Sequence, residues 1–326
     1  MEYRRLGSSE LEISCLSLGG NIFGHFCDKQ ETQAIIDTAG ELGINCIDTA
    51  DVYSDGASEE LIGQCVGSDR QRWIIATKVG VNSNEHPGGK GRRAYIFDHI
   101  EHSLRRLGTD YVDLYQMHHF DPDTPLDETV DALDALVKQG KVRQVGACNY
   151  SGQRLSEAHG LAVSNGAASF ATIQTSYNAF KRQAEEDVFP VCRESGMSAL
   201  VYGALARGVL TGKYATGVSA PTGSRATESA SISTDLTAPV LNAVGRLTTV
   251  ANAKGVSVTD LALAWAVHRP EVCSLIVGVR DPAQLEANAV AMDVSLTTDD
   301  ISGIEGAIGD RGQFAELSLG TFPRWE

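Results

Sequence analysis

The stretch LGINCIDTADVYSDGASE, residues 42–59, decides how the rest of the chain is interpreted. A short apolar segment follows Gly43 and ends at Asp48, which predicts a buried strand entered from a helix. Asp48 would then lie at the carboxyl end of that strand and Tyr53 on the loop beyond it, where α/β proteins place reactive groups. The alternative is structural, with Asp48 as a helix N-cap and Tyr53 as a half-buried loop residue.

The composition is that of an acidic chain with enough apolar residues for a large core. Its 326 residues include 27 Lys and Arg against 42 Asp and Glu, a formal net charge of −15, and 42% are hydrophobic. Nucleic acids and anionic membranes bind clustered basic side chains, so neither is expected as a partner. No apolar run approaches the ~18 residues of a membrane span, and no signal-peptide core follows the first residues. We therefore expect a soluble, cytoplasmic enzyme.

The seven cysteines are scattered and form no C-x-x-C pair, which favours a reducing compartment over a disulfide framework. Several, such as Cys46 and Cys148, lie in apolar runs, where Cys behaves as a small hydrophobic residue. We expect no zinc site and assign no metal. The composition shows no linker, so residues 1–326 are expected to form a single domain.

The order of the predicted elements determines the fold class. After a short hairpin in residues 1–10, apolar runs predict eight strands, at residues 13–18, 45–48, 72–78, 111–118, 142–148, 170–174, 197–202 and 272–277. Helical periodicity predicts helices at residues 29–41, 58–66, 95–107, 126–138, 154–163, 185–194, 240–254, 259–267 and 282–292. Residues 79–93 are expected to be a long loop, and residues 215–234 a mobile surface loop.

Eight strand-then-helix units predict an α/β fold, a closed (β/α)8 TIM barrel, with an open doubly wound sheet as the alternative. Neither the dinucleotide fingerprint G-x-G-x-x-G nor the P-loop string occurs where a Rossmann or P-loop fold would need it. The barrel is therefore the preferred prediction.

Four polar residues are predicted to meet at one rim of this barrel, because the carboxyl ends of all its strands lie there. Asp48 and Tyr53 follow the second strand, Lys78 ends the third and His118 ends the fourth. Taken singly, Lys78 is more often an exposed lysine at a strand end and His118 a satisfied core histidine. An acid, a phenol, an amine and an imidazole on adjacent strands together indicate a catalytic site, which we call the predicted tetrad.

The predicted tetrad suits the protonation of an oxygen that gains negative charge. A free Tyr titrates near ~10, and a nearby Lys ammonium is expected to lower the pKa of Tyr53. Asp48 would hold Lys78 in an ion pair, and His118 could hydrogen-bond a carbonyl oxygen and orient it. This chemistry needs no metal, serine nucleophile or carboxylate pair. Asp51, in the same stretch, is interpreted as a turn residue.

Seven segments share their order and spacing with a known family: IDTADVYSDGASEELIG (47–63), ATKVG (76–80), SLRRLGTDYVDLYQMHHFDPDTPLDET (103–129), GKVRQVGACNYS (140–151), IQTSYN (173–178), LARGVLTGKY (205–214) and VGVRDPAQLEAN (277–288). Through them nearly the whole chain resembles the aldo-keto reductases, in the branch of bacterial enzymes and potassium-channel beta subunits. The resemblance implies a (β/α)8 barrel with a C-terminal substrate loop that binds NADP(H) in extended form at the carboxyl rim. It also implies that Asp48, Tyr53, Lys78 and His118 are the catalytic residues.

The resemblance further implies a cofactor site. Asn149 and Gln174 match the pair that hold the nicotinamide carboxamide, and Tyr202 matches the ring that stacks on the nicotinamide. The residue before Asn149 is usually Ser in the family but is Cys148 here, and Tyr202-Gly203-Ala204-Leu205 stands where Tyr-Ser-Pro-Leu is common. The cofactor residues implied in this way are Gly20, Asn21, Cys148, Asn149, Gln174, Tyr202, Gly203, Leu205, Arg207, Gly208, Lys213, Gly278, Arg280, Gln284 and Asn288.

The residues around Arg280 predict a phosphate site in their own right. Residues 278–282 lead into a helix start, where backbone N–H groups and the helix dipole favour phosphate, and Arg280 adds a bidentate donor. By resemblance, Arg280, Gln284 and Asn288 hold the adenosine 2′-phosphate and adenine. Gln284 stands where many NADPH-specific members have Arg, so we expect NADPH as the cofactor with NADH as a possible substitute.

A carbonyl substrate is expected to contact Phe23, His119 and Phe120, with residues 82–90 and the tail 314–325 at the mouth of the pocket. For the tail aromatics, packing across the side of the barrel is the alternative. Such an aromatic pocket with polar edges accepts aldehydes, ketones or sugars alike.

The expected function is NADPH-dependent reduction of aldehydes or ketones, keto sugars included, with hydride from the nicotinamide and a proton from Tyr53. Three alternatives stay open. One is a reversible sugar or alcohol dehydrogenase that uses NAD(P)⁺, and another is a non-catalytic cofactor-sensing subunit like the channel-associated members. The third is a Schiff-base aldolase that uses Lys78. Whether the protein is a monomer or a homo-oligomer is also open.

Overall fold

The computed structural model describes residues 1–81, 89–215, 217–222, 224–228, 230–315 and 317–318. At its centre is a closed barrel in which all neighbouring strands run parallel, in the order β10-β3-β4-β5-β6-β7-β8-β9. The strands are β3 (Leu16–Gly19), β4 (Cys46–Asp48), β5 (Ile74–Val79), β6 (Val112–Met117), β7 (Val142–Cys148), β8 (Thr172–Ser176), β9 (Ser198–Tyr202) and β10 (Val272–Val277). The predicted (β/α)8 fold is confirmed.

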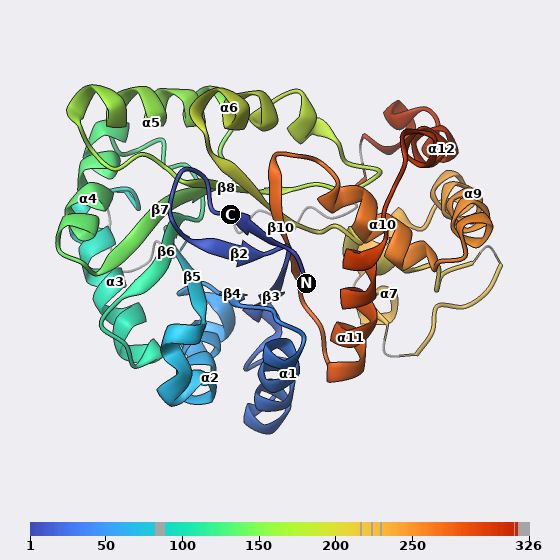
Figure 1. The fold of residues 1–326 in the computed structure, drawn as a ribbon, viewed down its shortest axis with the longest axis horizontal. Coiled ribbons are helices and arrows are strands. Elements are labelled where there is room, and N and C mark those ends of the chain that lie inside the picture. The colour runs from blue at the N-terminus through green and yellow to red at the C-terminus, as the bar shows by residue number, and fades with distance from the viewer. Residues whose placement is uncertain (82–88, 216, 223, 229, 316, 319–326) are drawn as a thin grey trace.

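Helices surround the barrel as an outer ring (Figure 1). The longer ones are α1 (Lys29–Glu41), α2 (Ala57–Val66), α3 (Arg93–Leu107), α4 (Leu126–Lys138), α5 (Gly152–Asn165), α6 (Val188–Ser195), α9 (Ala238–Lys254), α10 (Val258–Val267), α11 (Pro282–Val290) and α12 (Thr298–Ile308). Two short helices, α7 (Arg225–Glu228) and α8 (Ala230–Asp235), lie where a loop was predicted. Helix α12 was not predicted, although Thr297 and Asp300 form a capping box at its start.

A hairpin of β1 (Tyr3–Arg5) and β2 (Glu12–Ser14) covers the amino-terminal end of the barrel strands (Figure 1). Its Leu6 and Ile13 are fully buried in the cluster that fills the barrel interior. The prediction of one strand over residues 13–18 is wrong, because the chain ends the hairpin at Ser14 and begins the barrel strand β3 at Leu16. The carboxyl-terminal rim of the barrel is the end that the hairpin leaves uncovered.

Alternation along β5 places neighbouring side chains on opposite sides of the barrel wall. Ala76 belongs to the interior cluster, and Lys78 reaches across to Asp48. Thr77 points outward and donates a hydrogen bond of 2.6 Å to Glu59 on α2, which in turn pairs with Arg106 of α3. The strand is therefore held from both faces at the position that carries Lys78.

The close contact between α2 and α3 predicts a stability difference between two glycine variants. A Cβ on Gly63 would lie 2.4 Å from the Leu107 carbonyl oxygen, which is backbone and cannot rotate away. We expect Gly63→Ala to lower the free energy of unfolding by about 1–3 kcal/mol. On α5, a Cβ on Gly160 would meet nothing within 4 Å, so Gly160→Ala should raise it by about 0.5–1 kcal/mol. Urea unfolding measures both, and equal stability of the two variants would contradict the tight contact.

Candidate active site

The ammonium of Lys78 stands at the centre of the predicted tetrad. Lys78 is fully buried, and its Nζ lies 2.7 Å from Asp48 Oδ2, 2.7 Å from the Thr49 carbonyl oxygen and 3.2 Å from the Tyr53 hydroxyl. A lysine ammonium has three N–H donors, so each has an acceptor. The structure thus brings together the strand-end residues of β4 and β5 and the loop that follows β4.

Asp48 is the counter-ion of this buried cation. Its second oxygen, Oδ1, accepts a hydrogen bond of 2.7 Å from Gln174 Nε2. Burial raises the pKa of Asp48 overall, and the Lys78 charge and the hydrogen bonds from Lys78 and Gln174 offset part of that shift. Burial alone would lower the pKa of Lys78, yet the charges of Asp48 and Tyr53 raise it overall. The 2.7 Å contact between Lys78 Nζ and Asp48 Oδ2 has the geometry of an ion pair. The N-cap alternative for Asp48 is wrong because Gly56 precedes α2.

Tyr53 is held by an unusual backbone turn. The two residues after it, Ser54 and Asp55, have left-handed backbone angles (φ 52° and 54°), and the Ser54 hydroxyl donates to the Phe23 carbonyl. The prediction that Lys78 lowers the pKa of Tyr53 is wrong in its net direction. Burial of the hydroxyl raises the pKa to about 12, and the Lys78 charge offsets only part of that effect. The phenol is therefore protonated at neutral pH.

His118 follows β6 and faces Tyr53 across the rim. The two rings meet edge to face with centroids 5.8 Å apart, and His119 stacks on His118 at 5.2 Å. Burial and the charges of Lys78 and His119 hold the pKa of His118 well below its usual value. The imidazole is therefore neutral and can donate one N–H while its other nitrogen accepts.

Asp51 lies in the turn after β4, as predicted, but it is also buried. Its Oδ2 is 2.8 Å from His99 Nδ1 on α3, and its backbone N–H donates to the Lys78 carbonyl at 3.2 Å. The loop that carries Tyr53 is thus tied to both β5 and α3. The sequence alone could not show this partner, because His99 is 48 residues away.

The residues matched to the nicotinamide carboxamide lie beside the predicted tetrad. Asn149 is exposed at the rim with φ 59°. Its Oδ1 accepts from the Tyr202 hydroxyl at 2.7 Å, and its Nδ2 donates to the His118 carbonyl and to Cys148 Sγ, both at 3.1 Å. Gln174 is buried against Asp48. Strands β7, β8 and β9 therefore bring these side chains to the same rim as the predicted tetrad.

The predicted pyrophosphate residues form a cationic turn after β9. Ala206, Arg207 and Gly208 have left-handed angles (φ 48°, 57° and 94°), and a Cβ on Gly208 would lie 3.2 Å from Lys213 Nζ. Such a fold of consecutive backbone amides beside two cationic side chains suits a polyanion. Leu205 precedes this turn, and the left-handed Gly203 follows β9.

Arg280 stacks on an aromatic residue that sequence reasoning missed. Its guanidinium lies 4.1 Å from the ring centroid of Phe26, which is 46% exposed on the loop between β3 and α1. Gln284 accepts from the Arg280 backbone N–H and donates to Asp281, the N-cap of α11. No local sequence pattern marks this contact, because Phe26 and Arg280 lie on loops at opposite ends of the sequence.

The remaining predicted cofactor residues border the same rim. Gly20 and Asn21 follow β3, and Gly278 follows β10. A Cβ on Gly278 would lie 3.0 Å from Asn21 Oδ1, so these two loops approach each other closely. Asn288 is buried on α11. The donors and glycines gathered here fit an extended anionic dinucleotide.

The predicted substrate residues differ in their exposure. His119 and Phe120 are half-buried near the rim, and Phe120 packs edge to face on Tyr150. Phe23 is fully buried, and its substrate role stays a prediction. Phe314 is also fully buried and packs on Phe180, which agrees with the alternative of a packed tail. Residues 82–88, 316 and 319–326, with Trp325 among them, lie outside the described residues.

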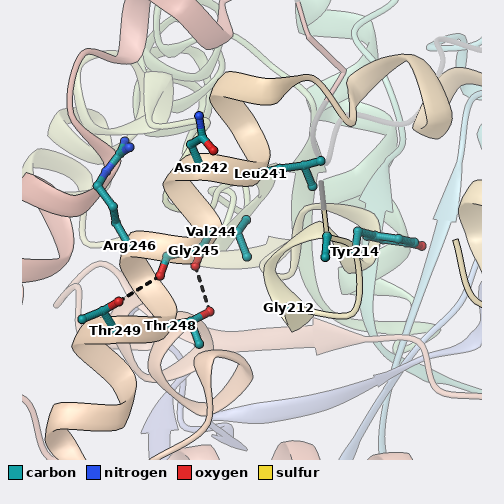
Figure 2. A pocket seen from close by; sticks show the side chains of 10 residues that line it. Gly212, Tyr214, Leu241, Asn242, Val244, Gly245, Arg246, Thr248 and Thr249 are labelled. Atoms are coloured by element: carbon teal, nitrogen blue, oxygen red, sulfur yellow. Dashed lines mark hydrogen bonds between the residues drawn. The ribbon is translucent and has the colours of Figure 1, made fainter. Parts of the chain in front are cut away.

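Figure 2 shows a surface hollow, whose volume is about 670 Å³. It is bounded by the loop of Gly212 and Tyr214 on one side and by α9 on the other, and it shares no residue with the tetrad. In the described part of the chain, no cluster of His, Cys, Asp or Glu side chains could hold a metal ion. Nor is any helix found there that is long and apolar enough to span a membrane.

Sequence comparison identifies the family. The Aldo/keto reductase family profile matches residues 15–308. The chain belongs to this family. It is 35% identical over 303 residues to a "Probable voltage-gated potassium channel subunit beta" of Arabidopsis thaliana, covering 90% of this chain and 92% of that protein. It is 33% identical to "Aldo-keto reductase YhdN" of Bacillus subtilis, covering 92% of this chain and 91% of the relative.

An "L-glyceraldehyde 3-phosphate reductase" of Escherichia coli (strain K12) is 32% identical to the chain, with 98% of this chain and 94% of that protein covered. The aldo-keto reductase described here is therefore an oxidoreductase, and carbonyl reduction is its general reaction. Enzymes of this family use nicotinamide cofactors.

The low pKa of His118 predicts how stability depends on pH. Below about pH 6.5, the usual pKa of histidine, the unfolded chain takes up a proton at His118 that the folded protein does not. Stability should therefore fall as the pH falls, with His118 contributing up to ~1.4 kcal/mol per pH unit.

Urea unfolding of the cofactor-free enzyme between pH 5 and 7.5 measures this slope. We expect His118→Gln to flatten it, whereas His25→Gln, which alters an exposed histidine, should keep the wild-type slope. The same slope in His118→Gln and wild type would contradict a buried neutral imidazole.

Proposed function

We propose that this aldo-keto reductase reduces aldehydes or ketones, keto sugars included, to alcohols with NADPH. The observation that carries the proposal is the contact of 3.2 Å between the Lys78 ammonium and the Tyr53 hydroxyl, with the neutral His118 ring beside it. Tyr53 is half-buried whereas Asp48, Lys78 and His118 are buried, so Tyr53 is the member of the tetrad that we expect the substrate to contact. A phenol that contacts a buried cation is placed to give up its proton when charge develops nearby.

In the proposed reaction, the Tyr53 hydroxyl donates its proton to the carbonyl oxygen as that oxygen gains negative charge. Bound NADPH would supply the hydride that the carbonyl carbon receives. Lys78 stabilises the phenolate left on Tyr53, which is reprotonated from solvent. The neutral His118 ring can donate a hydrogen bond to the carbonyl oxygen and so orient that oxygen, while the charge of His118 itself stays unchanged.

Residues at the same rim are proposed to bind the cofactor. The left-handed turn with Arg207 and Lys213 would hold the pyrophosphate, and Arg280 at the start of α11 the adenosine 2′-phosphate. Asn149, Gln174 and Tyr202 would hold the nicotinamide.

The proton donor is tested by Tyr53→Phe, which removes the hydroxyl and keeps the ring. We expect kcat for carbonyl reduction to fall by a factor of about 10²–10⁴, the usual contribution of a general acid, with the Kd for NADPH changed less than threefold. A screen of NADPH consumption over aldehydes, ketones and keto sugars gives kcat, and fluorescence titration gives Kd. Full activity of the variant would refute Tyr53 as the acid.

The 2′-phosphate site is tested by Arg280→Ala. Loss of a charge-assisted hydrogen-bonding group should raise the Kd for NADPH about tenfold or more, because such bonds contribute ~1.5–3 kcal/mol, and should leave NADH binding nearly unchanged. Arg93→Ala is the control, since Arg93 also stacks on an aromatic ring, that of Phe97. An unchanged NADPH/NADH preference in Arg280→Ala would rule out the proposed role.

A non-catalytic cofactor-sensing subunit is the second candidate, because one relative is named as a probable channel subunit. The reductase turns over carbonyl substrates and the sensor does not. The sensor would be favoured if the wild type bound NADPH tightly but reduced no member of the carbonyl panel. A Schiff-base aldolase is disfavoured, since imine formation needs a neutral amine whereas Asp48 and Tyr53 raise the pKa of Lys78.

A further inference from the structure

The side-chain amide of Gln174 has its orientation fixed by Asp48. Strands β4 and β8 lie opposite each other in the barrel order, so the 2.7 Å bond from Gln174 Nε2 to Asp48 Oδ1 crosses the barrel interior. An ionised carboxylate only accepts hydrogen bonds. The NH₂ group of Gln174 must therefore face Asp48, and its Oε1 must face the other way.

From Gln174 the hydrogen bonds continue in one consistent direction to the rim. Oε1 accepts from the Cys148 thiol at 3.6 Å, and Cys148 Sγ in turn accepts from Asn149 Nδ2 at 3.1 Å. Asn149 Oδ1 then accepts from the Tyr202 hydroxyl at 2.7 Å. Each group donates a hydrogen bond to the next group on the way to Asp48, because the Asp48 carboxylate at the end of the series can only accept. The thiol suits its middle position, since S–H is a weak donor and sulfur a weak acceptor.

We propose that Asp48 has a second task besides pairing with Lys78: it orients the Gln174 amide so that a bound nicotinamide carboxamide meets an acceptor. Asp48 is here a positioning residue, and Cys148 links the Gln174 amide to Asn149, whose NH₂ group also donates to the His118 carbonyl. The inference rests on the proposed function, because it assigns the cofactor carboxamide to Gln174. An acceptor at Oε1 complements the NH₂ group of the carboxamide.

The substitution Asp48→Asn should reverse this orientation. The Lys78 ammonium is a donor only, so the introduced amide must turn its oxygen to Lys78 and its NH₂ to Gln174. Gln174 would then have to turn its Oε1 toward position 48 and present its own NH₂ to the cofactor. The site would then disfavour a cofactor that presents a hydrogen-bond donor to Gln174, whereas the wild-type site favours one.

The test compares the Kd of NADP⁺ with that of its 3-acetylpyridine analogue, in which a methyl group replaces the carboxamide NH₂. We expect the wild type to prefer NADP⁺, and Asp48→Asn to reduce that preference about tenfold, the effect of one hydrogen bond. Tyr53→Phe is the matched control: it alters the tetrad but keeps the contact between Asp48 and Gln174, and should keep the wild-type preference. The readout is a ratio of binding constants by fluorescence titration and needs no turnover.

A pair of Cys148 variants keeps the inference testable if Asp48→Asn does not fold. Cys148→Ser retains a donor and an acceptor and should bind NADP⁺ as the wild type does, whereas Cys148→Ala removes both and should bind it several-fold more weakly. An unchanged ratio in Asp48→Asn, or equal binding by the two Cys148 variants, would overturn the inference while leaving the proposed function standing. Failure of the wild type to bind either NADP⁺ or NADPH would overturn both.

Discussion

The buried ammonium of Lys78 is the constraint on which the site depends. An isolated charge in a protein interior is very costly, and loss of one partner of a buried pair costs about 3–5 kcal/mol. Asp48 supplies the counter-charge for Lys78, and the Thr49 carbonyl and the Tyr53 hydroxyl lie within hydrogen-bond distance of the same ammonium. Strands β4 and β5 must therefore pair in the observed register, with Asp48 opposite Ala76, and the loop after β4 must turn back toward Tyr53.

The outer helices support this arrangement through a second set of buried polar contacts. Glu59 of α2 is fully buried and accepts from Thr77, the neighbour of Lys78, and from Arg106. On α3, His99 holds Asp51, which precedes Tyr53 by two residues. A barrel strand and the loop after its neighbour are thus fixed from outside by hydrogen bonds to buried polar side chains. Positioning of the reactive groups depends on helix packing as well as on the sheet.

The sequence predicted the barrel and the four rim residues because both follow from regular features. The alternating strand and helix patterns give the number of β/α units, and the residue that ends a parallel strand must lie at the carboxyl rim. Irregular features were missed. No typical turn residue marks the break at Cys15 between the hairpin and the barrel. The Phe26–Arg280 contact joins loops that lie far apart in sequence. The pKa of Tyr53 was predicted in the wrong direction because the competition between burial and a nearby charge depends on depth, which a sequence does not contain.

The charge states explain why such a site would favour a developing oxyanion. Lys78 and Asp48 carry opposite charges, and Tyr53 and His118 are neutral, so the four side chains sum to zero before reaction. Proton transfer from Tyr53 would place a phenolate against Lys78, whose ammonium also contacts Asp48. The cation would thus already be in contact with the oxygen that becomes charged, so this contact need not be formed during the reaction. Stabilisation would appear mainly as the charge forms, which accelerates a reaction more than uniform binding does.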